Sequence, residues 1–158
     1  MASPGAVLQG IEGRYSHAVL AFVGNDGYPA SVATGFTLDP RRGVVVLDDA
    51  GNIKSAQRED GASMFRIDIA KGKAWASVAM GASSRALAKR AKDNPNFFVT
   101  LAATAEGKFL PQTGGVLIKN AQGEILGAAG ASGGTGDEDE ACCIYGIEQA
   151  GLTPDASA

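Results

Sequence analysis

Four consecutive acidic residues, Asp137 to Glu140, follow a loop of small residues at 132–136. Carboxylate oxygens are ligands for iron and other hard cations, so this run has the chemistry of a metal site. The same acids stand at the start of an expected helix, where the helix dipole stabilises negative charge. The dipole explains them without a metal, and we favour that interpretation. The loop also has the look of a phosphate loop, but adjacent acids repel an anion, which favours a purely structural loop.

The chain has one histidine, His17, and two adjacent cysteines, Cys142 and Cys143. A Ser-His-Asp arrangement needs His17 as its base, but no G-x-S-x-G nucleophile elbow accompanies it. No Cys/His cluster has the spacing of zinc ligands, and no dinucleotide or phosphate motif follows a strand. Neighbouring helical positions point about 100° apart, so the two cysteines are poorly placed to pair. We interpret them as small core residues, with redox sensing as the alternative.

The acidic run belongs to a helix with clear start and stop signals. Thr135 and Glu138 stand three residues apart just before an apolar run. This spacing predicts a capping box with Thr135 at the N-cap. Gly151 fits the position that ends such a helix. The helix is expected over 136–150, with three residues packed inward: Cys143, Ile144 and Ile147.

Two β-hairpins are expected to support this helix. Apolar runs at 116–118 and 125–129 flank turn-forming residues at 120–123, which is typical of two strands joined by a tight turn. A second hairpin is expected over 44–58, with its turn at 48–52. Two hairpins that are each followed by helix predict an α+β fold, an antiparallel β-sheet with helices packed on one face.

The opening of the chain predicts strands. Apolar segments at 18–23, 30–38 and 44–47 are separated by strong turn signals, which is typical of a three-stranded meander. Val, Phe and Thr cluster between the turns and favour strands over helix. The alternative is a helix over 11–23.

Helices are expected between the two hairpins. The segment 64–80 predicts one helix, and a second follows a cap at Ser83 or Ser84. Residues 97–101 predict a short strand or a helical turn. The loop at 104–113 contains apolar residues and is expected to be a pocket wall or an oligomer contact.

Composition limits the class of protein. The chain has 158 residues, 45% of them hydrophobic and 20% charged, as expected for one globular domain. We expect a flexible tail at 1–14, a single domain at 15–152 with an atypical meander at 15–43, and a second tail at 153–158.

Charge and hydropathy exclude several partners at this stage. The net charge of −3 and the lack of a basic run argue against nucleic-acid binding. No apolar run approaches the roughly 20 residues that a membrane span requires. The N-terminus lacks the pattern of a secretory signal, so a cytoplasmic protein is expected.

The motifs of the second half resemble a known family. Residues 114–140 are similar to the C-terminal signature of the GlcG/HbpS-like family, which includes the C-terminal domain of PduO-type proteins. That signature has a Gly-Gly opening, a hairpin and a V-S-G-G-T-x-x-x-D segment. Here the segment is ASGGT at 131–135, with Asp139 after it. Residues 60–74 resemble the middle motif of the family. Because these motifs occur in the family's order, the resemblance covers about 43–152.

The resemblance implies a haem-binding or haem-handling protein that assembles as a homo-oligomer. Haem requires an apolar slot, an axial ligand and cations for its propionates. As the sole imidazole, His17 is the candidate iron ligand. The other candidate haem-binding residues are Arg58 and Lys73 for the propionates, and Thr113, Gly114 and Gly115 as family-matched pocket positions.

Two alternatives remain open at this stage. The family usually opens with a helix, whereas residues 15–47 are more similar to the opening meander of flavin-binding split-barrel proteins. This favours, as the alternative, an oxidoreductase that depends on FMN or a small metabolite. The other alternative is a non-catalytic accessory protein that only assembles. Whether the protein is an enzyme is not decided by its residues.

Overall fold

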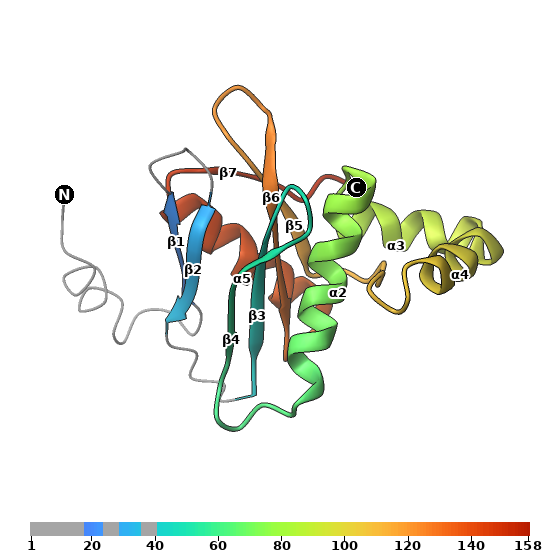
Figure 1. Cartoon of the computed structure of the whole chain (residues 1–158), viewed down its shortest axis with the longest axis horizontal. Coiled ribbons are helices and arrows are strands. Elements are labelled where there is room, and N and C mark those ends of the chain that lie inside the picture. Colours follow the sequence, from blue (N-terminus) through green and yellow to red (C-terminus); the bar gives the residue numbers. More distant parts are fainter. Residues whose placement is uncertain (1–17, 24–28, 36–40) are drawn as a thin grey trace.

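The computed structural model of the chain describes residues 18–23, 29–35 and 41–158. These residues form a five-stranded antiparallel sheet, a separate two-stranded pair and four helices (Figure 1). His17 and the predicted tail at 1–14 lie outside the described residues. The strands are β1 Ala18–Val23, β2 Pro29–Gly35, β3 Gly43–Asp48, β4 Ile53–Arg58, β5 Gly115–Lys119, β6 Ile125–Ser132 and β7 Thr153–Asp155. The helices are α2 Phe65–Met80, α3 Ser84–Asp93, α4 Pro95–Thr104 and α5 Gly136–Gln149.

The large sheet has the strand order β4-β3-β6-β5-β7, and every neighbouring pair is antiparallel. The α+β class and both predicted hairpins, β3–β4 and β5–β6, are confirmed. Small residues in β6 let α2 approach closely. A Cβ on Gly130 would lie 2.1 Å from the carbonyl oxygen of Ala70 in α2, so only glycine fits this contact.

The helices cover both faces of the sheet, not the single face predicted. Val45 and Leu47 of β3 pack against α2, whereas Val44 and Val46 of the same strand pack against α5. Alternate side chains of a strand point to opposite faces. Strand β3 is buried at every position, and such an uninterrupted apolar run is typical of a strand with a layer on each side.

The opening strands form their own hairpin. β1 and β2 pair antiparallel, with Ala18 opposite Gly35, so strands rather than a helix occupy the described part of this segment. The predicted three-stranded meander is wrong in its third member. Strand β3 is hydrogen-bonded on one edge to β4 and on the other to β6, which leaves no edge for β2. β1 packs beside α5, and β2 lies beside β4.

The end of α2 and the start of α3 lie where the local signals predict. α2 ends at Gly81, whose φ is +59°, and Ser83 caps α3 by accepting a hydrogen bond from the Ala86 amide at 3.1 Å. Residues 97–101 belong to the ten-residue helix α4 instead of a strand or a single turn. Pro95 starts this helix, because a helix leaves its first N–H groups unpaired in any case.

The C-terminal segment, expected as a tail, contains β7. This short strand pairs with β5, with Ile118 opposite Pro154, and so covers an otherwise open edge of the sheet. Within the described residues, the structure has no helix that is long and apolar enough to span a membrane.

Candidate functional site

The loop after β6 is held in place by the cap of α5. Thr135 accepts a hydrogen bond from the Glu138 amide at 3.3 Å, and the Thr135 amide donates to the Glu138 carboxylate at 2.8 Å. The predicted capping box is therefore confirmed. Gly151, with φ of +75°, ends the same helix as predicted. The cap defines the turn of α5 on which Asp139 lies.

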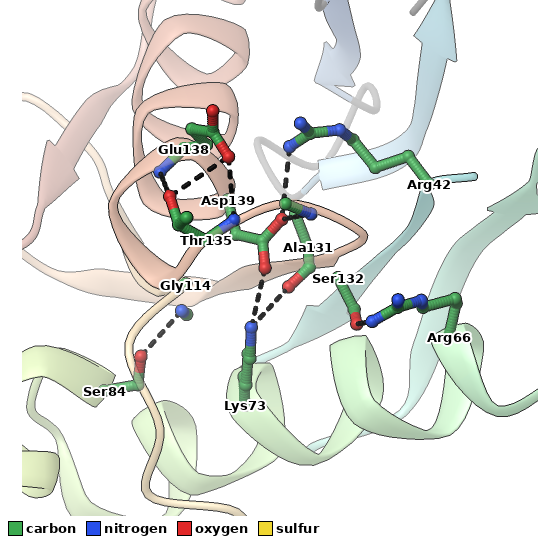
Figure 2. Close-up of polar contacts among 12 residues, drawn as sticks. Arg42, Arg66, Lys73, Ser84, Gly114, Ala131, Ser132, Thr135, Glu138 and Asp139 are labelled. Atoms are coloured by element: carbon green, nitrogen blue, oxygen red, sulfur yellow. Dashed lines mark hydrogen bonds and ion pairs between the residues drawn. The ribbon is translucent and has the colours of Figure 1, made fainter. Parts of the chain in front are cut away.

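Asp139 is the centre of a buried charge cluster, with a side chain only 2% exposed. One carboxylate oxygen accepts a hydrogen bond from Arg42 Nη1 at 3.1 Å and another from the Gly134 amide at 3.0 Å. The other oxygen accepts from Lys73 Nζ at 2.9 Å, and this ammonium also donates to the Ala131 carbonyl at 2.9 Å. Figure 2 shows these contacts converging on Asp139 from three segments. A buried carboxylate is stable only with such partners.

Arg42 brings a second cation to Asp139. Two cations, Arg42 and Lys73, share the one carboxylate of Asp139, and both are buried. The Arg42 Nε atom has no hydrogen-bond partner among the described residues. The cluster joins the chain just before β3 to α2 and α5, and it lies at the base of a surface pocket.

That pocket has a volume of about 660 Å³ and lies between the start of α2, the loop before β5 and the start of α5. Its size falls within the range of ordinary ligand sites. Its apolar wall comes from Phe65, Ile69 and Leu110. Its polar side includes Arg66, Lys73, Thr113, Ser132, Thr135 and Asp139. The apolar loop predicted as a pocket wall does contribute Leu110.

Arg66 lies on the polar side of this pocket. Its Nη1 atom is 3.4 Å from the Ser132 hydroxyl, which it approaches as a donor (Figure 2). The contact is long for a hydrogen bond, so most of the guanidinium's donor capacity is left for a ligand. Among the described residues, Arg66 and Lys73 are the cations that line the pocket.

Two glycines pack behind the pocket. Gly114 has φ of +117°, and a Cβ there would lie 2.8 Å from Lys73 Nζ. A Cβ on Gly115 would lie 2.6 Å from the Lys73 carbonyl oxygen. The Gly115 amide also donates to the Ser84 hydroxyl at 2.6 Å. These glycines therefore allow the chain to pass close to Lys73 instead of lining the pocket themselves.

The four acids of α5 all have protein partners. Arg85 on α3 pairs with Asp137 and, at 2.8 Å, with Glu140. Hydrogen bonds to Glu140 and then to Asp137 raise the pKa of Arg85 above its usual value. Glu138 belongs to the capping box, and Asp139 to the buried cluster. No group of three or more metal-ligating side chains is found in the described part of the chain, and capping and ion pairing account for the acidic run.

The sequence-predicted site residues separate into three groups. Lys73 and Thr113 line the pocket, and Gly114 and Gly115 pack behind Lys73. Arg58 is an exposed residue of β4 whose Nη1 donates to the Ala62 carbonyl at 2.5 Å, and it does not line this pocket. His17 is not among the described residues. It directly precedes β1, which contacts α5.

Sequence reasoning missed Arg42, Arg66 and the burial of Asp139. One signal was present for Asp139, because it stands four residues before Cys143 and so shares its face of the helix. Cys143 was itself predicted to pack inward and is fully buried. No comparable signal marks Arg42, which follows Arg41 in a turn-forming segment.

The fold is a small α+β domain, and its pocket combines apolar side chains with charged ones of both signs. Residues 37–148 match the HbpS-like family, whose description is "Haem degrading protein HbpS-like". The chain therefore belongs to this family. This match covers well over half of the chain and confirms the predicted family. No curated protein matches the chain.

Several solved structures share this fold. A PduOC:haem complex has a TM-score of 0.63 at 23% identity, covering 70% of this chain and 79% of that one. Protein ORFY of Klebsiella pneumoniae has a TM-score of 0.62 at 24% identity, covering 70% and 74%. A double mutant of Streptomyces reticuli HbpS has a TM-score of 0.59 at 29% identity, covering 69% and 70%. The family description and the first of these structures both refer to haem.

Proposed function

We propose that this protein binds haem in the pocket between α2 and α5. The observation that carries the proposal is the mixed chemistry of the pocket lining, which combines the apolar Phe65, Ile69 and Leu110 with the cationic Arg66 and Lys73. Phe65 is 63% exposed, and an aromatic ring in this position offers a flat apolar contact. The family and the PduOC:haem complex support the same ligand.

The residues fit the demands of haem in two respects. The apolar wall suits the macrocycle, and the Arg66 guanidinium suits a carboxylate, to which Arg binds strongly. Lys73 also lines the pocket, where its ammonium is shared with Asp139. Thr113 adds a hydroxyl, and Gly114, which has no Cβ, leaves room for the Lys73 ammonium. Bound haem would supply an iron centre, whose properties depend on its axial ligand.

We assign the axial ligand to His17. The described lining of the pocket contains no His, Cys, Met or Tyr, the side chains that commonly ligate haem iron. His17 is the only histidine of the chain, and it precedes a strand that packs on α5.

We further propose that the protein self-associates and has no strong catalytic machinery beyond its ligand. Exposed apolar side chains such as Met64, Phe97 and Val99 support self-association. The family description and the names of the similar structures mention no flavin, so they lend the FMN alternative no support.

The test is a titration of the purified protein with haemin, followed at the Soret band. We expect a saturable spectral change with one haem per chain. Arg66→Gln is expected to weaken binding about fivefold, which corresponds to about 1 kcal/mol. Arg58→Gln removes the same charge outside the pocket and is the matched control.

Three further comparisons sharpen this titration. Phe65→Ser removes the aromatic wall, and Ile53→Ser is its control, since Ile53 is another exposed apolar residue. Haemin dimethyl ester lacks free carboxylates, so Arg66→Gln is expected not to affect its binding. His17→Ala is expected to shift the Soret maximum. Absence of any saturable change would rule out haem binding, and equal affinities for the pocket variants and their controls would rule out this pocket.

A further inference from the structure

Helix α4 is exposed along most of its length yet has no charged side chain. Of its ten residues, Pro95–Thr104, only Phe98 is buried. Phe97 is 45% exposed and Val99 is 69% exposed. The solvent face of a surface helix normally carries charged residues, whereas protein interfaces are poor in charge and rich in aromatic side chains. The exposed face of α4 therefore has the composition of a contact surface.

The two threonine hydroxyls of α4 need no water. The Thr100 hydroxyl donates to the Asn96 carbonyl at 3.0 Å, and the Thr104 hydroxyl donates to the Thr100 carbonyl at 2.9 Å. Each hydroxyl is thus bonded within the helix. Covering them with another protein surface leaves no donor without a partner, which removes the main cost of burying polar groups.

A groove of about 290 Å³ lies beside this face, where α3 meets α4. Its base is aromatic: Phe98 lies under Arg90, whose Cζ is 5.9 Å from the ring centroid, and Phe97 meets Phe98 edge-on at 5.6 Å. The groove is lined by Arg90, Asp93, Asn94, Phe97 and Phe98.

Arg90 and Asp93 give this groove one charge of each sign. They stand three residues apart on α3 and therefore lie on the same face of the helix. Neither forms an ion pair with another described residue. A two-fold axis that passes between these two residues would bring Arg90 against Asp93 of the partner subunit, and the reverse, because a two-fold interface presents the same surface twice.

We propose that α4 and this groove form a two-fold interface with a second copy of this chain. Phe97 of each copy fills the groove of the other, and the two Arg90–Asp93 pairs surround it. A uniformly charged partner, such as nucleic acid or an anionic lipid surface, would be attracted by one of these residues and repelled by the other. A second copy of the groove carries both charges and is therefore the better match. The inference rests on the self-association proposed above but does not depend on haem binding.

Charge reversal tests this symmetry directly. Arg90→Asp and Asp93→Arg each place like charges opposite each other in a homodimer, so each is expected to weaken dimerisation at least about tenfold. An equal mixture of the two variants pairs opposite charges at both positions and is expected to form a heterodimer. Lys89→Asp is the matched control, because Lys89 is an exposed cation of the same helix outside the groove.

Sedimentation equilibrium measures each dissociation constant, with circular dichroism as the check of folding. Phe97→Asp is expected to give a folded monomer. A wild-type protein that stays monomeric over the accessible concentration range would overturn self-association altogether. A wild-type dimer in which Arg90→Asp, Asp93→Arg and Phe97→Asp all behave like Lys89→Asp would overturn this interface alone. Haemin titration of the same variants tests the haem site independently. It therefore distinguishes a failure of self-association, or of this interface, from a failure of haem binding.

Discussion

At the scale of single residues, Asp139 has the greatest consequence for stability. Its carboxylate neutralises part of the charge of Arg42 and Lys73, two cations that are themselves buried. A buried ion is tolerated only when partners replace its lost hydration. The complete cluster therefore lowers the stability of the fold only slightly, whereas removal of its anion lowers the stability greatly.

Replacing Asp139 by Asn is expected to destabilise the protein by about 3–5 kcal/mol. The amide keeps the shape of the side chain but leaves two buried cations without an anion. Urea unfolding at neutral pH measures the change in unfolding free energy. Asp137→Asn is the control, because Asp137 is 82% exposed, and it is expected to cost no more than about 1 kcal/mol. Equal losses in the two variants would contradict the central role of Asp139.

The two cysteines are expected to be inert in the folded protein. Both are buried and form no disulfide, which agrees with the prediction that they are small core residues. Burial raises the pKa of Cys142 from its usual value of 9.0 to about 11, and burial raises the pKa of Cys143 as well. Two pKa units lower the thiolate fraction at pH 8 about 100-fold, and the thiolate is the reactive form.

A thiol reagent that absorbs on reaction measures this difference. Labelling at pH 8 is expected to be at least about 100-fold slower in the folded protein than in urea, with both thiols released together on unfolding. The alternative of redox sensing requires at least one thiol to react rapidly in the native state, so fast native labelling would revive it.

At the scale of elements, β7 is attached to β5 by an ion pair as well as by the sheet. Lys119 Nζ lies 2.6 Å from the Asp155 carboxylate, which also accepts hydrogen bonds from the side chain and the amide of Ser157. The hydrogen bond from Lys119, followed by those from Ser157, lowers the pKa of Asp155 to about 2 from 3.8. The charged form is therefore favoured by folding.

This pKa shift predicts a pH dependence with a definite sign. A lowered folded-state pKa contributes stability above the unfolded value of 3.8, and that contribution is lost as the pH falls towards about 2. Asp155→Asn is therefore expected to cost roughly 1 kcal/mol at pH 7. The difference from wild type is expected to shrink between about pH 4 and pH 2. Urea unfolding across this range measures it, with the exposed Asp60→Asn as control. A difference that does not change with pH would show that packing, not charge, attaches β7.

At the scale of the whole molecule, the pocket joins elements that are remote in the chain. Its lining comes from α2, the loop before β5 and the start of α5, and the buried cluster beneath it joins α2 and α5 across the end of β6 (Figure 2). A ligand held there contacts both helical layers. Its binding energy therefore adds to the stability of the complete fold.

Haemin is accordingly expected to raise the unfolding free energy of the protein. A ligand that binds only the native state adds about 2.7 kcal/mol at 100 times its dissociation constant. Chemical unfolding followed by circular dichroism, with and without haemin, measures the gain. Arg66→Gln is expected to reduce the gain at a fixed haemin concentration, whereas Arg58→Gln leaves it unchanged. An undiminished gain in Arg66→Gln would place the haem elsewhere on the molecule.

The amino-acid sequence by itself determined the features that depend on neighbouring residues. The two hairpins, the Thr135–Glu138 capping box and the helix end at Gly151 all follow from interactions within a few residues. The family motifs are also local strings of residues, and they identified the HbpS-like family. Local rules of this kind need no knowledge of the rest of the fold.

Tertiary structure alone decided the layers and the site. Asp139 meets Lys73 and Arg42, which are 66 and 97 residues away in the chain, and no local pattern reports which distant cation will reach a carboxylate. Strand pairing across the chain decided three further features. These are the helices on both faces of the sheet, the separate β1–β2 pair and the exclusion of Arg58 from the pocket. Such contacts become fixed only when the whole core is packed, because burial and pairing are properties of the assembled fold.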